Sequence, residues 1–164
     1  MIRMDPVSMD PVVLRQAFSC FPSGVTAVCA MIGDTPVGMA ASSFTSVSVD
    51  PPLVSVCVQD TSATWPRLRS LPRLGLSVLA EEHDTACLTL SKKVGDRFDG
   101  VEWERSASGA VFVHSSAVWL ECSLYRELPA GDHGIALLEI DALRADPDTP
   151  PLVFHRSRFR RLAS

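Results

Sequence analysis

Residues 21–58 read FPSGVTAVCAMIGDTPVGMAASSFTSVSVDPPLVSVCV, a series of short apolar runs separated by turn residues. The run 25–32 is rich in β-branched and small apolar side chains, which predicts a strand. Gly33 and Pro36 predict a turn after it, and a second strand is expected from about Val37. This region is therefore expected to fold as strands joined by tight turns.

Two further strands are predicted in the same region. Residues 44–49 alternate, so that Phe44 and two serines face one way and a threonine and two valines face the other. Pro51 and Pro52 interrupt this run. Residues 53–58 then predict another strand, with three valines on one face.

The rest of the chain continues with short elements. Asp10 followed by Pro11 predicts the start of a helix, because aspartate caps helix N-termini and proline suits the first helical position. This helix is expected to end before Pro22. Short helices are expected over residues 62–70 and 83–90. Strands are expected over 74–79, 111–113, 117–125 and 135–143, with loops over 91–98 and 129–134.

The order of these elements predicts a mainly β fold. Strands do not alternate regularly with helices, and no GxGxxG motif follows the first strand. This favours a closed antiparallel barrel or sandwich over a doubly wound sheet. We expect one domain over residues 1–164, with residues 1–9 as a flexible N-terminal tail.

Composition excludes several classes of function. The 164 residues are 46% apolar and carry a formal net charge of −4, which is typical of a globular protein and gives no electrostatic footprint for nucleic acid. No apolar run is long enough to span a membrane. The opening residues lack the apolar core of a signal peptide, so a cytoplasmic location is expected. Four arginines between residues 156 and 161 are interpreted as a solvated terminus.

The cysteines and histidines do not form a recognisable metal site. Five cysteines are widely spaced without a CxxC pair, and we expect reduced thiols, four of them within apolar segments. The four histidines do not stand at metal-ligand spacing with one another, with cysteines or with carboxylates. No metal is predicted.

One segment of small residues is the main candidate for a binding site. Gly38–Ser46 places Ala40, Ala41, Ser42 and Ser43 together, and such side chains let a flat aromatic ligand lie against main chain while hydroxyls bond its rim. The alternative is that these small residues only allow close packing between strands.

Charged and polar residues suggest where a phosphate could bind. Ser62 and Thr64 suit an anion if they lie at a helix N-terminus. Lys92, Lys93 and Arg97 are candidate mobile charges for the phosphate, although a solvated loop explains them equally well.

His133 is the candidate catalytic residue. It stands in the sequence Gly131-Asp132-His133-Gly134, which predicts a tight loop at the mouth of a strand. The alternative is a simple turn in which His133 points into water.

These motifs together resemble the flavin reductase family, the small components of two-component flavin monooxygenases. The likeness runs from about Phe18 to Leu162 and consists of several anchors in the expected order. The anchors are FPSGVT (21–26), the block 38–46, SVDPPLV (48–54), SAT (62–64), DRFDGV with Trp103 (96–103), LEC (120–122), GDH (131–133) and the closing residues 154–162.

The resemblance implies a fold and an assembly. The fold is a split β-barrel of the Greek-key, FMN-binding type with a few short flanking helices. The assembly is a homodimer with flavin bound near the subunit interface.

The resemblance also implies roles for individual residues. Ala41, Ser42 and Ser43 would line the isoalloxazine ring, and His133 would contact the nicotinamide. The nicotinamide side would also be bordered by Met39 and Ala40. The ribityl chain and phosphate would be held by Cys57, Val58, Gln59, Ser62, Ala63 and Thr64. The loop with Lys93 would flank the phosphate or adenylate end, and the closing motif adds Arg158 and Phe159.

The implied reaction is transfer of a hydride from C4 of NADH or NADPH to N5 of FMN or FAD. The reduced flavin would then diffuse to a separate monooxygenase. Two other readings stay open. One is a split-barrel protein that uses flavin or deazaflavin on its own substrate. The other is a dimer that binds flavin without turnover.

Overall fold

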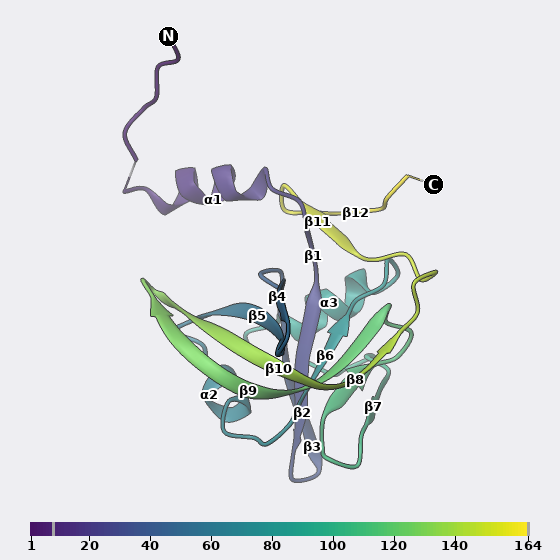
Figure 1. Cartoon of the computed structure of the whole chain (residues 1–164). Coiled ribbons are helices and arrows are strands. Elements are labelled where there is room, and N and C mark those ends of the chain that lie inside the picture. The colour runs from purple at the N-terminus through teal and green to yellow at the C-terminus, as the bar shows by residue number, and fades with distance from the viewer. Residues whose placement is uncertain (8, 164) are drawn as a thin grey trace.

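The computed structural model describes residues 1–7 and 9–163, which form one large sheet, two small sheets and three helices (Figure 1). The large sheet has seven antiparallel strands in the order β3-β2-β6-β9-β10-β5-β4. Their bounds are β2 Thr26–Ile32, β3 Thr35–Ala41, β4 Thr45–Val49, β5 Pro52–Gln59, β6 Leu74–Val78, β9 Val118–Ala130 and β10 His133–Ala145. The predicted mainly β architecture is confirmed.

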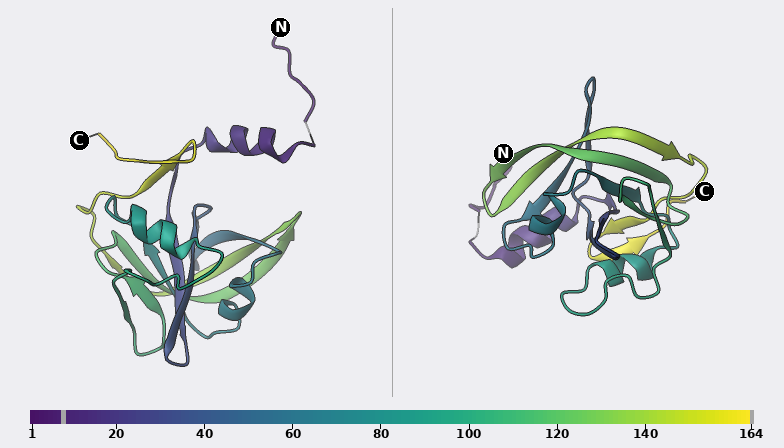
Figure 2. Two further views of the ribbon diagram at one scale, coloured as in Figure 1. Left: turned by 180° about the vertical axis from the view of Figure 1, so that it is seen from behind. Right: turned by 90° about the horizontal axis from the view of Figure 1, so that it is seen from below.

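The large sheet curves strongly but does not close, so the expectation of a closed barrel was wrong (Figures 1 and 2). Its hydrogen-bonded ladder ends at β3 on one side and at β4 on the other. The candidate cavity lies where β3 and β5 approach each other, since residues 39–41 and 57–59 both line it. A continuous ladder between the edges would fill that space with backbone.

Smaller elements complete the structure. A three-stranded sheet contains β1 (Ser23–Gly24), β11 (Val153–His155) and β12 (Arg158–Arg160), and a hairpin contains β7 (Trp103–Arg105) and β8 (Val111–Val113). Only β8 of these five strands was predicted, because two- and three-residue strands carry too little periodicity to be recognised.

Two hydrophobic clusters hold these layers together. One cluster fills the concave side of the large sheet and includes Val28, Val56, Leu76 and Leu138. The other lies on the opposite face of β2, where α3, β8 and the β11–β12 hairpin pack on it. β2 is therefore buried on both faces, which explains its nearly continuous apolar sequence.

The hairpin of β9 and β10 differs most from the expectation. Both strands have 13 residues, and the loop expected over 129–134 shrinks to a tight turn at Gly131 and Asp132. Gly131 has a φ of +70°, a conformation that glycine adopts easily. Proline and glycine in this stretch predicted a loop, but Pro129 and Gly134 pair with each other inside the ladder.

The first helix, α1 (Pro11–Ser19), has the expected N-terminus. The Asp10 carboxylate accepts a hydrogen bond from the Val12 backbone N–H at 2.9 Å. The helix buries none of its residues and lies apart from the large sheet (Figure 2). Its last residue, Ser19, accepts a hydrogen bond from the Arg156 N–H, between β11 and β12, at 2.9 Å. Its apolar residues Val13 and Phe18, with Phe21 after it, are exposed.

The other two helices are shorter than predicted. α2 covers only Trp65–Leu68, and α3 covers Asp84–Leu90. The charged stretch after α3 is a loop, as expected. None of the helices in the described part of the chain is long and apolar enough to cross a membrane.

The expected N-terminal tail is covered only in part. Residues 1–7 form no helix or strand and are exposed. Ser8, also part of that predicted tail, lies outside the described residues, so the flexibility of the tail stays a prediction.

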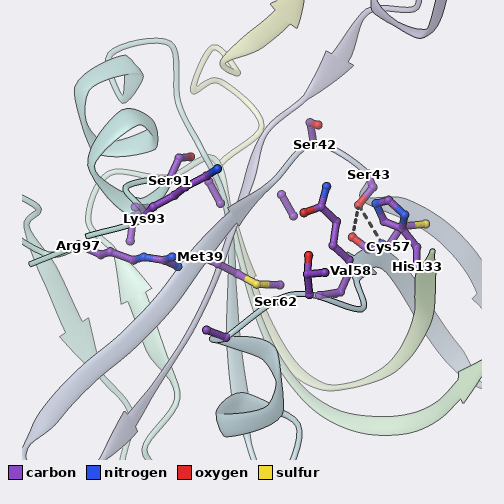
Figure 3. A pocket seen from close by; sticks show the side chains of 16 residues that line it. Met39, Ser42, Ser43, Cys57, Val58, Ser62, Ser91, Lys93, Arg97 and His133 are labelled. Carbon is purple, nitrogen blue, oxygen red and sulfur yellow. Dashed lines mark hydrogen bonds between the residues drawn. The ribbon is translucent and has the colours of Figure 1, made fainter. Parts of the chain in front are cut away.

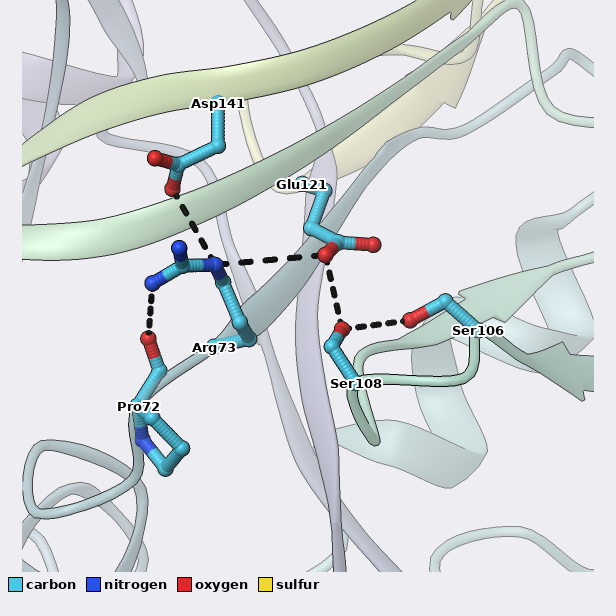
Figure 4. Close-up of polar contacts among 6 residues, drawn as sticks. All are labelled: Pro72, Arg73, Ser106, Ser108, Glu121 and Asp141. Carbon is cyan, nitrogen blue, oxygen red and sulfur yellow. Dashed lines mark hydrogen bonds and ion pairs between the residues drawn. The ribbon is translucent and has the colours of Figure 1, made fainter.

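A polar cluster ties the turn between β7 and β8 to the large sheet (Figure 4). Nε of Arg73 lies 3.5 Å from the Asp141 carboxylate and 4.0 Å from that of Glu121. The Ser108 hydroxyl donates to Glu121 at 2.7 Å. Because Arg73 and its partners are partly exposed, these ion pairs contribute little free energy and mainly fix the position of the turn.

His83, the N-cap residue of α3, makes stability depend on pH. Its Nδ1 accepts a hydrogen bond from the Ala80 backbone N–H at 3.0 Å, which requires the unprotonated nitrogen. Partial burial lowers the pKa of His83, and contacts with His114 and Glu82 oppose this effect. The unfolded chain therefore binds a proton on this residue at a higher pH than the folded chain does.

We expect acidification to destabilise the protein through His83. As the pH falls below the unfolded pKa of about 6.5, the free energy of unfolding decreases until the folded pKa is passed. In the His83→Asn variant the asparagine has an acceptor oxygen but does not titrate. Its free energy of unfolding is therefore expected to fall less on acidification than that of the parent. Urea unfolding at pH 7.5 and 5.5 measures both slopes, and identical slopes would contradict the assignment.

Candidate functional site

A cavity of about 630 Å³ lies between the ends of β3 and β5 and is the main candidate site (Figure 3). Its volume falls within the range of about 300–1,000 Å³ that is usual for small-molecule sites. The lining residues are Met39, Ala40, Ala41, Ser42, Ser43, Cys57, Val58, Gln59, Thr61, Ser62, Ala63, Leu90, Ser91, Lys93, Arg97 and His133. Most of the residues assigned from the sequence thus come together here.

One wall of the cavity is the end of β3. This strand pairs residue by residue with β2, with Met39 opposite Val28 and Ala41 opposite Thr26. The Thr26 hydroxyl donates to the carbonyl of Ala41 at 3.1 Å, which holds the end of the strand in place. Because Ala40 and Ala41 have only a Cβ, a flat ligand can approach the backbone there.

The two serines after this wall have different roles. The Ser43 hydroxyl donates to the Cys57 carbonyl at 3.1 Å and accepts from the Cys57 N–H at 2.9 Å. It therefore bridges the gap between the β3 end and β5, and its proton is not available to a ligand. Within the described residues Ser42 has no hydrogen-bond partner for its exposed hydroxyl, which makes it the better candidate for the rim of a ligand.

The floor of the cavity comes from the end of β5 and the segment that leads into α2. The Ser62 hydroxyl accepts a hydrogen bond at 3.1 Å from the N–H of Trp65, the first residue of α2, while its own proton can still be donated. Thr64 is buried and does not line the cavity. Its hydroxyl instead accepts a hydrogen bond from Arg97 at 2.9 Å.

One end of the cavity is positively charged. Lys93 and Arg97 lie on the side opposite His133 (Figure 3), and no carboxylate is among the described residues that line the cavity. The expectation that Arg97 is a mobile charge was wrong, because its Nη1 donates to the Gly38 carbonyl at 3.1 Å and to Thr64. Arg97 is therefore a fixed cation, and Lys93 is the exposed one.

His133 lies at the other end, but it does not stand in a loop. It is the first residue of β10, paired with Ala130 in β9 and Gln59 in β5. The Asp132 carbonyl accepts a hydrogen bond from the Asp60 N–H at 3.0 Å, which ties the hairpin to the residue that follows β5. The ladder therefore holds the backbone of His133 in place beside the cavity.

A neighbouring carboxylate orients the imidazole of His133. Nδ1 lies 2.7 Å from Oδ1 of Asp132, and since a carboxylate only accepts, Nδ1 carries the proton. This hydrogen bond and the electrostatic attraction between the His133 ring and the carboxylate lower the pKa of Asp132. Nε2 then remains for contact with a ligand.

Three assigned residues lie outside this cavity. Thr64 acts through Arg97, as described above. Phe159 lines a smaller adjoining cavity, and Arg158 lies on the opposite face of β12 because side chains alternate along a strand. Sequence reasoning left Thr61, Leu90, Ser91 and Arg97 out of the assigned site. Only Arg97, a cation near Lys93, carried a sequence signal.

The five cysteines are free thiols. Cys29, Cys87 and Cys122 are buried, and burial raises the pKa of Cys29 to about 12, so this thiol stays protonated. Cys20 and Cys57 are exposed, and Cys57 lines the cavity although its segment is apolar. Within residues 1–7 and 9–163 no group of three His, Cys, Asp or Glu is placed to hold a metal ion.

The fold defines a split-barrel protein, and its main cavity has a wall of small residues and two cations at one end. The chain belongs to the flavin reductase family, because the family model described as "Flavin reductase like domain" matches residues 18–163. The predicted family and the predicted split β-barrel are thereby confirmed.

Similar proteins include a named flavin reductase and the reductase subunit of a monooxygenase. The chain is 40% identical over 159 residues to the NADH-dependent FAD reductase of Streptomyces globisporus, covering 94% of this chain and 87% of that one. It is 31% identical to HsaB of Rhodococcus jostii, the reductase subunit of a flavin-dependent monooxygenase, covering 93% and 78% of the two chains.

A solved structure agrees along nearly the whole chain. It is the NADH:FAD oxidoreductase SgcE6 of Streptomyces globisporus C-1027 in complex with NAD and FAD fragments. The TM-score is 0.91 at 38% sequence identity, and the match covers 98% of each chain.

Proposed function

We propose that this protein is an NAD(P)H:flavin oxidoreductase that reduces FMN or FAD and supplies the reduced flavin to a separate monooxygenase. The observation that carries this proposal is the cavity with its alanine wall, its two cations at one end and His133 at the other. A flavin phosphate has the size, flatness and charge that these residues accommodate. Family membership and the named activities of the relatives support the same reaction.

In this proposal the flavin supplies the redox chemistry by accepting a hydride at N5 from the nicotinamide, and the chain supplies position. The alanine wall lets the ring lie flat, and Lys93 with Arg97 holds the phosphate end. Ser42 is placed to bond the rim of the ring. His133 borders the nicotinamide, and because its Nδ1–H is held by Asp132, Nε2 keeps one orientation.

The assembly and location belong to the same proposal. Exposed apolar residues on and beside α1, among them Val13, Phe18 and Phe21, support a homodimer, because a monomer would leave them in water. The proposed location is the cytoplasm.

The test of the reaction is NADH or NADPH consumption at 340 nm with FMN and with FAD. Rapid consumption that depends on added flavin is expected with at least one pair. Flavin binding without consumption would instead show a flavin-binding protein without this activity. Consumption that requires a further substrate would show an enzyme that acts on its own substrate.

We expect His133→Ala to lower kcat/KM for NADH by about 10- to 100-fold, because misplacing a reacting ring by about 1 Å has an effect of this size. The dissociation constant of the flavin is expected to stay within about twofold. Steady-state kinetics and calorimetric titration of flavin measure these two quantities. His155→Ala, on β11 and outside the cavity, is the control, and an unchanged rate in His133→Ala would remove His133 from the site.

A further inference from the structure

A second, smaller cavity adjoins the first and is almost entirely apolar. It has a volume of about 200 Å³ and shares Ala40, Ala41, Ser42 and Ser91 with the main cavity. We call it the phenylalanine chamber, after Phe154 and Phe159. Its remaining lining residues are Val25, Cys87 and Leu88.

Two aromatic rings form one side of the phenylalanine chamber. The centroids of Phe154 and Phe159 are 5.6 Å apart, with an angle of 55° between the rings. The two residues are paired across the β11–β12 hairpin, and Phe154 also pairs with Ser23 of β1. The rings are therefore presented by a hydrogen-bonded sheet, which limits the loss of conformational freedom when a ligand binds.

Another part of the lining comes from α3. Leu88 of this helix is 62% exposed although it borders an apolar cavity, and Cys87 beside it is buried. Because the volume lies below the range of about 300–1,000 Å³ for complete ligands, the chamber suits one ring of a larger molecule. That molecule must extend into the main cavity through the shared residues.

We propose that the phenylalanine chamber binds the adenine ring of FAD, and this proposal rests on the proposed flavin reductase function. Adenine is flat and stacks on aromatic side chains. The apolar lining offers it stacking surface and few hydrogen-bond partners. A flavin whose phosphate lies near Lys93 has its adenylate next to Ser91, which lines both cavities.

The position of the chamber favours the adenine of FAD over that of NADH. The nicotinamide is assigned to the His133 end, and His133 does not line the chamber. Of the four residues shared by the two cavities, Ala41 and Ser42 are assigned to the flavin ring, Ser91 stands two positions before Lys93, and Ala40 alone is assigned to the nicotinamide side. The chamber thus makes this chain selective for FAD over FMN.

The experiment compares the binding of FAD and FMN to the full chain by isothermal titration calorimetry. Phe159→Ala is expected to raise the dissociation constant of FAD at least about fivefold, the lower end of what loss of one stacking aromatic produces. The constant for FMN is expected to stay within about twofold. Phe159→Tyr retains the ring and should bind FAD like the parent.

A matched control tests for general damage to the hairpin. Arg160→Ala changes the same strand on its opposite face, outside the chamber, and should leave both constants unchanged. Circular dichroism and the melting temperature establish that each variant is folded. If Phe159→Ala does not fold, Leu88→Asp places a charge at the exposed rim of the chamber and is expected to weaken FAD selectively.

Two other outcomes would overturn the proposal. Equal weakening of FAD and FMN would make the chamber part of the flavin-ring site. A raised KM for NADH with unchanged FAD binding would assign the chamber to the nicotinamide nucleotide. Selective loss of FAD binding in a protein that never oxidises NADH would support the chamber and contradict the reductase function alone.

Discussion

Ala41→Leu is expected to abolish most flavin binding in a protein that still folds. The larger side chain projects from the β3 end, where Ala41 lines both the main cavity and the phenylalanine chamber. Overfilling a well-packed space costs about 1–3 kcal/mol, so the dissociation constant should rise at least about fivefold. Calorimetric titration with FMN and with FAD measures it, and flavin-dependent NADH oxidation should fall in parallel.

The same substitution outside the cavity provides the control. Ala142 lies exposed on β10 and lines none of the cavities described above. Ala142→Leu should therefore leave flavin affinity and melting temperature close to those of the parent. Normal flavin affinity in a folded Ala41→Leu variant would show that the alanine wall does not contact the ligand.

Gly75→Ala is expected to lower the free energy of unfolding by at least about 2 kcal/mol. Gly75 lies in β6, where a Cβ would come within 2.1 Å of the Val111 carbonyl oxygen and 2.9 Å of the Val111 nitrogen. These are backbone atoms of β8, so no side-chain rotation relieves the overlap. Urea unfolding measures the change, and for a chain of this size the melting temperature should fall by at least about 4 °C.

Gly24 offers the comparison for this effect. A Cβ on Gly24 meets nothing within 4 Å, and its φ is not in the left-handed region. Gly24→Ala is therefore expected to leave stability unchanged or raise it by up to about 1 kcal/mol, because alanine restricts the unfolded chain. Equal stabilities of the two variants would contradict the close approach of β8 to β6.

Local patterns in the sequence predicted much of the fold and the candidate wall. The start of α1 followed from Asp10 and Pro11, because capping depends on adjacent residues. The strands β2 and β5 followed from runs of β-branched residues. The segment 38–46 was recognised by its small side chains, since their size is independent of fold.

Some site residues were predicted with the wrong surroundings. His133 was expected in a loop because glycines flank it, yet the ladder with Ala130 and Gln59 makes it part of a strand. Ser43 was expected to bond a ligand, but Cys57, 14 positions away, occupies its hydroxyl. In both cases the deciding partner comes from another strand, and nothing in the local sequence announces it.

The amino-acid sequence by itself determined where strands and the first helix form and which residues are small enough for a flat ligand, because those properties act over a few positions. Only the tertiary structure decided that the sheet stays open between β3 and β4, that Arg97 is fixed by Gly38 and Thr64, and that Phe154 and Phe159 enclose a second chamber. Arg97 lies 59 and 33 positions from Gly38 and Thr64, and the chamber joins α3 to the β11–β12 hairpin. The interaction energies of these contacts depend on distances between residues that are set only when the chain has folded.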